Sequence, residues 1–504
     1  MDFLHSVLIG FYHCLEPLIL LYCFIGVFIG TLVGVLPGIG PAGALAILLP
    51  ATYNAPPLAS IVMLSGIYYG ALYGGSTTSI LVNIPGEPAS IITCLDGYKM
   101  ARQGRAGPAL GISAFGSFIA GTMGVIGLMA LAYPLAQLAL GFGPFEYFSL
   151  MILGLILLSY LGQKSFIRSL IMAALGLLLS FVGTDVISGQ ERFTFGVDEL
   201  YDGIPIVPMV MGLFGIAEIL ENIEMRIQRD IFKTSVRELL PTVKDWTDSI
   251  WPIIRGTVVG FFLGILPGGG AILASFASYA IEKRVSKHPE RFGTGAIEGV
   301  AGPESANNAA SSAAFIPLLT LGIPSNVIMA MLFAGLLLHG IKPGPLLLKD
   351  HPDIFWGVIT SMYFGNVILL ALNLPLIGLW VQLLKIPFRY LFPTIILFCF
   401  VGVYSINSVV FDIGMMIAFG VAGYMMRKLN FEPPLVVLAF VLGPLIEENL
   451  RRGLIISHGS FTMFFVRPIS GVCMAVALML LILACVPFLR KKREQMFQVE
   501  ESRS

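Results

Sequence analysis

Long runs of apolar residues, separated by short clusters of polar ones, make up most of the chain. The runs at residues 109–136 and 472–489 illustrate the pattern, and an α-helix needs about 20 such residues to cross a bilayer. Each run is continuously apolar, whereas the strands of a transmembrane barrel alternate between apolar and polar positions. The pattern therefore predicts an all-α polytopic membrane protein with about 11–14 membrane segments, some of them broken or re-entrant.

The composition agrees with a chain that lies mostly in lipid. Only 12% of the 504 residues are charged and 56% are hydrophobic, whereas about 25% of residues are charged in an ordinary soluble domain. The formal net charge is zero, which gives no electrostatic reason to expect nucleic acid as a partner. The six cysteines form no Cys-x-x-Cys or Cys/His cluster, so we expect no disulfide framework, no zinc site and no cofactor.

Two motifs occur twice in the same order, which indicates an internal repeat. GVFIGTLVGVLPGIG at 26–40 aligns with GTVVGFFLGILPGGG at 256–270, and NIPGE at 83–87 has a counterpart in GIPSN at 322–326. We therefore expect two membrane halves joined by a basic interfacial linker. The expected boundaries are 1–223 for the first half, 224–249 for the cytoplasmic linker, 250–490 for the second half and 491–504 for a cytoplasmic tail.

Basic residues indicate which loops face the cytoplasm. The segment at 489–495 is rich in Lys and Arg, which places the C-terminus in the cytoplasm by the positive-inside rule. The loop at 282–293 carries four Lys or Arg residues, whereas its counterpart at 52–60 has none. Basic loops thus fall at different places in the two halves, as expected for the inverted-topology repeats of many secondary transporters.

The stretch GIGPAG at 38–43 fits the dinucleotide-binding pattern G-x-G-x-x-G, but its context does not. An apolar helix precedes it and no acidic residue follows before Glu87, whereas that fingerprint needs a preceding strand and an acid about 20 residues further on. Glycines at every fourth position from Gly26 onward instead indicate a helix face that packs closely against a neighbouring helix.

Each glycine-rich face ends in a Pro-Gly pair, at Pro37-Gly38 and at Pro267-Gly268. Pro lacks an amide donor and Gly permits positive φ, so we expect the helix to break at both places. A break at membrane depth is tolerated only where it is buried in protein or lines a cavity. Matching breaks in the two halves are typical of a transporter binding site.

A polar stretch at 73–87 precedes another expected break. Ser76–Thr78 and Asn83 lie just before Pro85-Gly86. A broken helix here would present free backbone N–H groups and the positive end of a helix dipole, which suit an anion. The alternative is a tight helix crossing capped by Ser and Thr.

Within residues 298–326, the carboxylate of Glu304 and the amides of Asn307 and Asn308 interrupt an otherwise apolar region. Such groups are costly in a membrane and usually face a partner or a water-filled cavity. Glu304 is therefore a candidate sodium ligand or proton carrier. The alternative is a capping glutamate in an interfacial turn, which the preceding Pro303 favours.

The stretch IEENLRRG at 446–453 places two glutamates four residues before two arginines. Residues four apart share a helix face, so we interpret this stretch as an internally paired helix end with a structural role. The sequence contains no H-E-x-x-H, G-x-S-x-G or P-loop motif, and we do not expect an enzyme.

Long motifs in this chain resemble those of the large membrane subunit of the tripartite tricarboxylate transporters, the TctA type. They include GTLVGVLPGIGP, GIYYGALYGGSTTSILVNIPGEPASIITCLDGYKMARQGRAG, FGTGAIEGVAGPESANNAA and LGPLIEENLRR, and they extend over nearly the whole chain. The resemblance implies a secondary transporter of the bacterial inner membrane that imports a small carboxylate such as citrate, driven by a Na⁺ or H⁺ gradient. It also implies two partners, a small membrane subunit (TctB type) and a periplasmic solute-binding protein (TctC type).

With this resemblance we expect alternating access around one central site. Backbone N–H groups around Ser76–Thr78 and Ser325-Asn326 would hold carboxylates, and carbonyl groups together with Glu304 would hold the cation. The candidate ion-coupling residues are Glu304, Ser305 and Asn307. The candidate substrate-binding residues are Gly38, Gly40, Gly75, Ser76, Thr77, Thr78, Asn83, Pro85, Gly86, Gly268, Gly269, Gly270, Asn307, Asn308, Pro324, Ser325 and Asn326.

Other functions remain alternatives at this level. An anion channel or facilitator would move carboxylates without ion coupling. An intramembrane enzyme would need a reactive pair of side chains, which we do not find. A passive scaffold for the partner subunits would have no use for polar breaks within the bilayer.

Overall fold

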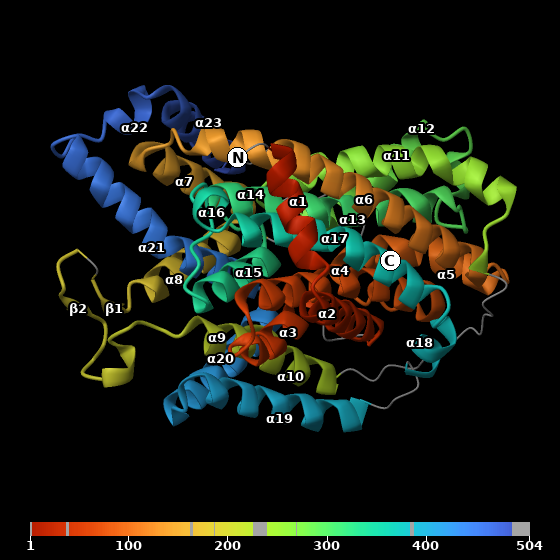
Figure 1. The fold of residues 1–504 in the computed structure, drawn as a ribbon, viewed down its shortest axis with the longest axis horizontal. Helices are drawn as coiled ribbons and strands as arrows, with labels where there is room; N and C mark the ends of the chain where they lie inside the picture. Colours follow the sequence, from red (N-terminus) through yellow and green to blue (C-terminus); the bar gives the residue numbers. More distant parts are fainter. Residues whose placement is uncertain are drawn as a thin grey trace.

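The computed structural model describes residues 3–36, 40–161, 165–185, 187–224, 239–268, 270–383 and 388–485. They form a bundle of helices (Figure 1), and the one sheet found among them is the antiparallel pair β1 (Gly183–Thr184) and β2 (Glu191–Arg192). Eight helices in these parts of the chain are long and apolar enough to cross a membrane, and five shorter apolar helices accompany them. The chain is therefore an all-α polytopic membrane protein, as predicted.

Two helices, α4 and α13, form the buried centre of the bundle. Every residue of α4 from Leu58 to Val82 is buried, and so is every residue of α13 from Gly299 to Ala313. The helices follow one another along the chain as α1 (Phe3–Cys14), α2 (Pro17–Val35), α3 (Gly40–Leu48), α4 (Pro57–Val82), α5 (Ile91–Arg102), α6 (Ala106–Ala139), α7 (Pro144–Leu161), α8 (Phe166–Ser180), α9 (Ile206–Val210), the π-helix Met211–Ile216, α10 (Ala217–Glu224), α11 (Val243–Ile265), α12 (Gly270–Val285), α13 (Glu298–Ala313), α14 (Phe315–Leu321), α15 (Val327–Leu338), α16 (Leu347–Asp350), α17 (Pro352–Asn373), α18 (Ile377–Leu383), α19 (Phe388–Asn407), α20 (Val410–Lys428), α21 (Pro433–Ile456), α22 (Met463–Val466) and α23 (Pro468–Cys485).

Backbone-to-backbone contact joins α2 to α4. Each of the three glycines on the α2 face lies so close to α4 that a Cβ atom there would overlap a main-chain carbonyl oxygen. The glycines are Gly26, Gly30 and Gly34, and the carbonyl groups belong to Met63, Ile67 and Ala71. The glycines spaced four apart thus form a close-packing helix face, as the sequence predicts.

The second half contains the same contact between α11 and α13. Gly256, Gly260 and Gly264 lie against the carbonyl groups of Gly302, Ala306 and Ala310. A shift of 230 residues relates the two sets of glycines, and a shift of 239 relates the two sets of carbonyl groups. The two helix pairs therefore share one packing register, which supports the interpretation of an internal repeat.

The helices break where the Pro-Gly pairs predict. Helix α2 ends at Val35 and α3 begins at Gly40, while α11 ends at Ile265 and α12 begins at Gly270. The residue after each broken helix is extended, with φ/ψ of −87°/102° at Leu36 and −74°/131° at Leu266. In the second break Gly268 has a φ of +79°, a conformation that favours glycine.

A second pair of breaks follows the Asn83 and Gly322 motifs. Both residues are left-handed, with φ of 57° at Asn83 and 69° at Gly322. Four residues later, Glu87 and Asn326 are both extended and cap the next helical turn. The same order of backbone conformations therefore occurs in both halves.

Residues 225–238 of the expected linker and the expected tail at 491–504 lie outside the described residues. Gly38 and Gly269 do so too. The domain boundaries and the inverted topology therefore stay predictions.

The charged stretch in α21 pairs internally, as predicted. Glu447 contacts Arg451 at 3.1 Å, and Glu448 contacts Arg452 at 2.6 Å, both with a spacing of four residues. Part of the stretch also has a tertiary role, because its side chains bind a hairpin elsewhere in the chain.

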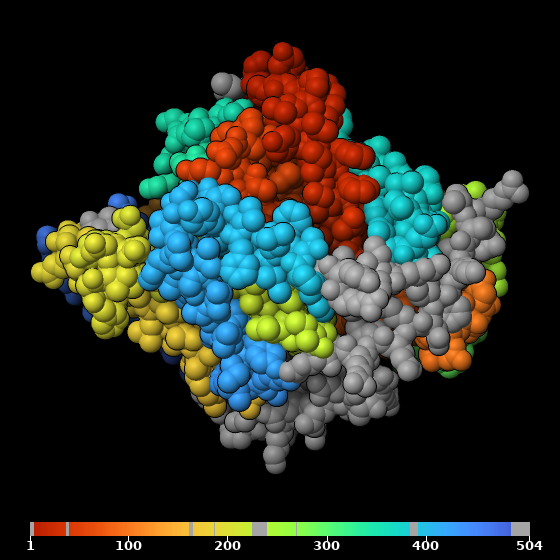
Figure 2. All heavy atoms as spheres, turned by 90° about the horizontal axis from the view of Figure 1, so that it is seen from below, coloured from red at the N-terminus to blue at the C-terminus, as the bar shows by residue number. Residues whose placement is uncertain are grey.

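This hairpin, built from β1 and β2, is held against α21 by charged side chains. Arg451 donates to both carboxylate oxygens of Asp185 at 2.8 Å, and Arg192 pairs with Glu447 at 2.8 Å. Figure 2 shows the hairpin region, in yellow, at one end of the molecule. The ion pairs fix its position there.

The Asp185 pairing predicts a pH-dependent stability. Hydrogen bonds from the backbone N–H of Ile187 and from Arg451 hold the pKa of Asp185 well below its usual value. A depressed folded-state pKa adds stability above the unfolded pKa of about 3.9 and loses it as pH falls toward the folded pKa. We therefore expect Asp185→Asn to lower the Tm at pH 7, and the difference from wild type to shrink below about pH 4. Thermal unfolding in detergent across this pH range measures it, and a constant Tm difference would contradict the account.

The glycine contacts predict that an added methyl group lowers the stability at a closely packed glycine but not at an open one. Gly260→Ala would press a methyl group into the Ala306 carbonyl, and overpacking of this kind costs about 1–3 kcal/mol. The matched control is Gly414→Ala in α20, where no atom lies within 4 Å of an added Cβ. Thermal unfolding should show a lower Tm for the first variant and an unchanged or higher Tm for the second. Equal changes in Tm for the two variants would show that the close contact at Gly260 does not limit the stability of the protein.

Candidate functional site

Helix α13 carries the polar residues predicted for the second half and lies at the centre of the molecule. It packs against α11 and α12 of its own half and against α5 and α6 of the first half. Glu304 is 1% exposed, and Ser305, Asn307 and Asn308 are as deeply buried. Because the helix continues without interruption through Glu304, the alternative of a capping glutamate in an interfacial turn is wrong.

Three hydroxyl groups from the first half surround the Glu304 carboxylate. Ser76 of α4 donates to Oε2 at 2.5 Å, and Thr93 of α5 donates to Oε1. The hydroxyl group of Ser113 of α6 lies nearby as a third polar neighbour of this carboxylate. Among the described residues, its side-chain hydrogen bonds are thus all to neutral hydroxyls, and no Lys or Arg pairs with it. A buried carboxylate without a counter-charge is costly.

A second buried carboxylate, Glu87, lies beside the same helix. Its Oε1 accepts a hydrogen bond from Asn307 Nδ2 at 3.1 Å, and its Oε2 accepts one from the backbone N–H of Ala89 at 2.8 Å. Glu87 also caps the 3-10 turn Pro88–Ser90 that leads into α5, where the N-terminal backbone N–H groups favour a negative charge. Our sequence reasoning did not select Glu87, although its position at the end of the repeated NIPGE motif, opposite Asn326 in the second copy, was the available signal.

Other polar atoms on α13 are only partly paired. Asn308 Nδ2 donates to Ser117 Oγ of α6 at 2.8 Å and to the Glu304 carbonyl at 3.0 Å. The Ser305 hydroxyl and Asn307 Oδ1 are buried without a hydrogen-bond partner among the described residues. Unpaired buried polar atoms are rare in native proteins, and a bound water or ion is a common explanation.

Ser76, Thr77 and Thr78 lie inside α4, which is unbroken until Val82. Their backbone N–H groups are within the helix, so the expectation that these amides are free to hold a carboxylate is wrong. The Thr78 hydroxyl donates to the carbonyl oxygen of Val35 at 3.0 Å, at the C-terminal end of α2. Thr78 therefore fits the alternative of a capped helix crossing, while Ser76 serves the Glu304 carboxylate.

The Asn83–Gly86 segment brings Glu87 close to both α2 and α4. A Cβ atom at Gly86 would overlap the carbonyl oxygen of Gly34, and one at Gly75 would lie 2.9 Å from Glu87 Cγ. Small residues at these positions are therefore required by packing.

The other two breaks lie next to each other. The N–H of Gly268 donates to the carbonyl oxygen of Ser325 at 3.0 Å. Asn326 Oδ1 accepts from the backbone N–H of Met329 at 3.0 Å and so caps α15. The structure thus joins the turn before Gly270 to the Pro324–Asn326 segment, as a group separate from the hydrogen bonds around Glu304.

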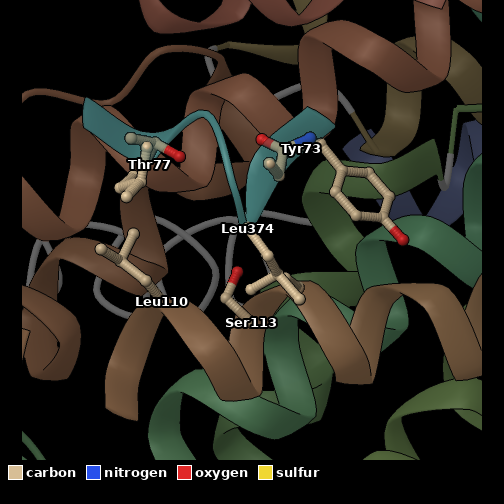
Figure 3. A pocket seen from close by; sticks show the side chains of 8 residues that line it. Tyr73, Thr77, Leu110, Ser113 and Leu374 are labelled. Atoms are coloured by element: carbon tan, nitrogen blue, oxygen red, sulfur yellow. The ribbon is translucent and has the colours of Figure 1, made fainter. Parts of the chain in front are cut away.

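A small cavity lies between α4, α6 and the end of α17. Figure 3 shows Tyr73 and Thr77 on one side, Leu110 and Ser113 on the other, and Leu374 between them. Ser113 connects the cavity with Glu304, because it lines the cavity and lies near the carboxylate. The full lining is Tyr73, Thr77, Leu110, Ser113, Ala114, Asn373, Leu374 and Ile377.

The side chains around Glu304 suit a hard cation better than a transition metal. Within the described residues, no group of three or more His, Cys, Asp or Glu side chains is placed to hold a metal ion. Hard cations take oxygen ligands, and the hydroxyl and carboxylate groups around Glu304 supply only oxygens.

Asp96 of α5 forms a further connection between the halves. Its Oδ1 accepts hydrogen bonds from three backbone N–H groups in the loop before α13, at 2.7–2.8 Å. Its Oδ2 accepts one from the Tyr279 hydroxyl at 2.9 Å. The sequence could not reveal this connection, because backbone amides carry no side-chain signal. The donors are Gly293, Gly295 and Ala296.

Asp96→Ala should therefore loosen the loop before α13. The substitution leaves three backbone N–H groups without their acceptor, which costs about 1–3 kcal/mol for each group that stays buried. We expect faster amide hydrogen exchange at residues 293–296 in the variant, measured by mass spectrometry. Asp350→Ala, at an exposed position on α16, is the control and should leave the loop unchanged. Unaltered exchange in Asp96→Ala would contradict the assigned role.

Comparison with known proteins gives the family. The sequence profile of the tripartite tricarboxylate transporter TctA family matches residues 20–438. An uncharacterized 52.8 kDa protein in the TAR-I ttuC' 3'region of Agrobacterium vitis is 51% identical over 501 residues, which cover 99% of this chain and 100% of that protein. An uncharacterized protein in the TAR-II ttuC' 3'region of the same organism is 54% identical over 238 residues, which cover 47% of this chain and 98% of that protein. No solved structure matches. The chain belongs to the tripartite tricarboxylate transporter TctA family.

Proposed function

We propose that this chain is the large membrane subunit of a secondary active transporter that imports a small carboxylate, a tricarboxylate such as citrate or a related acid, together with Na⁺ or H⁺. One observation carries the proposal. The Glu304 carboxylate is buried where the two halves meet, and its hydrogen-bond partners are hydroxyl groups. An ionised carboxylate without a counter-charge is costly inside a membrane, and a bound cation or proton removes that cost.

The distribution of ligands between the halves explains how ion and movement would be linked. Glu304 belongs to the second half, whereas Ser76 and Thr93 belong to the first. Movement of one half against the other would break these hydrogen bonds and expose the carboxylate. Neutralising Glu304 with a cation or a proton lowers the cost of that exposure, so the bound ion would permit the change of access.

The carboxylate substrate would bind near the breaks. Two features of the breaks support this placement of the substrate. The two NIPGE-like turns have matching backbone conformations, and the turns at Gly268 and Ser325 contact each other. Asn307 and Asn308 provide amide groups close to Glu87 and Glu304. We propose these groups as candidates for orienting the substrate.

The family further supports a complex. We propose that the chain is not an enzyme and works in the bacterial inner membrane, with its C-terminus in the cytoplasm and its halves inverted. Its partners would be a small membrane subunit and a periplasmic solute-binding protein that delivers the substrate. The family name supports a tripartite assembly in general terms.

Uptake in proteoliposomes tests the function. The chain is reconstituted with its small membrane subunit, the solute-binding protein is added outside, and labelled di- and tricarboxylates are offered under imposed Na⁺ or H⁺ gradients. We expect accumulation above equilibrium with one of the gradients. Uptake that is insensitive to both gradients would support an anion channel or facilitator instead.

Glu304→Gln tests the coupling residue. The amide has nearly the shape of the carboxylate but carries no charge and cannot exchange a proton, so the gradient should no longer drive concentrative uptake. We expect accumulation to fall by about tenfold or more, as removal of about 1.4 kcal/mol of coupling would produce. Glu290→Gln, whose side chain is 69% exposed, is the control. Full accumulation by a well-folded Glu304→Gln protein would exclude Glu304 from coupling.

A further inference from the structure

We propose that the small cavity between α4, α6 and the end of α17 binds a small monovalent cation, Na⁺, through oxygen atoms of Thr77, Ser113 and Asn373. The inference rests on the proposed transport function, because it names the coupling ion and its site. It differs from our sequence expectation in placing the ion beside Glu304, with Ser113 between them, instead of on the carboxylate itself.

The first observation is an unpaired acceptor on Asn373, a residue that lines the cavity. Asn373 is 7% exposed, and its Nδ2 donates to the carbonyl oxygen of Leu369 at 2.9 Å. This bond fixes the amide orientation and leaves Oδ1 buried without a hydrogen-bond partner among the described residues. An amide oxygen can only accept, so a bound cation or a donor such as water would satisfy it.

The electrostatic surroundings favour a cation over an anion. Ser113 lines the cavity and also lies near the Glu304 carboxylate, so a negatively charged group lies on the other side of Ser113 from the cavity. Helix α17 ends at Asn373, beside the cavity, and the C-terminal end of a helix carries partial negative charge. Both features attract a positive ion and repel a carboxylate.

The chemistry and size of the cavity further restrict which ligand it can bind. Three of the lining residues, Thr77, Ser113 and Asn373, carry hydroxyl or amide oxygens, which hard cations prefer. There is room for a guest of about the size of one water molecule. A dehydrated Na⁺ ion fits such a space, whereas a di- or tricarboxylate does not.

Ser113 would then connect the ion to the movement of the halves. A cation bound to its oxygen lies next to the Glu304 carboxylate and reduces the electrostatic cost of that charge. Thr77 and Ser113 belong to the first half and Asn373 to the second. Formation of the site therefore requires one relative position of the halves, so ion binding would select that position.

Binding of ²²Na⁺ to the purified full-length chain tests the site without requiring transport. We expect saturable binding by wild type in choline buffer, and a half-saturating Na⁺ concentration at least about tenfold higher in Asn373→Leu, since loss of a partner around a bound metal commonly costs 10- to 100-fold. Thr77→Val should act in the same direction. The matched control is Asn449→Leu, because Asn449 also donates to the carbonyl four residues earlier, at 2.8 Å, but lies on α21.

The outcomes separate this inference from the proposed function. Unchanged Na⁺ affinity in well-folded Asn373→Leu and Thr77→Val would overturn the site, even if wild type shows Na⁺-driven uptake. Absence of Na⁺ binding by wild type would also overturn it. Conversely, Na⁺ binding that is weakened by both substitutions would support the site even if no labelled carboxylate is transported.

Discussion

Direct contact between backbones, made possible by glycine, is the constraint on which the arrangement of this protein depends. The glycines of α2 touch the carbonyl groups of α4, and those of α11 touch α13 in the same register. Apolar side chains gain little by packing against each other in lipid, so close approach and hydrogen bonding must hold the helices together. The contact fixes α4 and α13 at the centre, and there Ser76 reaches Glu304.

The helix packing is repeated in the two halves, but the buried carboxylate is not. The shift of 239 residues that relates the two packing contacts places Ser65 opposite Glu304. The buried carboxylate of the second half thus has a small hydroxyl residue as its counterpart in the first half. This asymmetry supports a single coupling site, framed by a duplicated set of helix breaks.

The sequence predicted the architecture well because the features that specify a membrane helix lie within its own segment of the chain. Apolar length, the glycine spacing and the Pro-Gly pairs each reflect a constraint within one segment, and the helices and both Pro-Gly breaks follow them. Partners across the structure were harder to foresee. Thr93 and Ser113 meet Glu304 only through folding, and Ser76–Thr78 looked like part of a break although α4 continues to Val82.

We propose that neutralising Glu304 permits the two halves to move, and substrate counterflow measures that movement. Proteoliposomes loaded with unlabelled carboxylate exchange it for labelled carboxylate without any imposed gradient, so the measurement reports movement of the loaded site and not coupling. The permanently neutral Glu304→Gln protein should retain counterflow while being unable to accumulate substrate. Loss of counterflow in a correctly folded and inserted variant would contradict the account, and so would retention of gradient-driven accumulation.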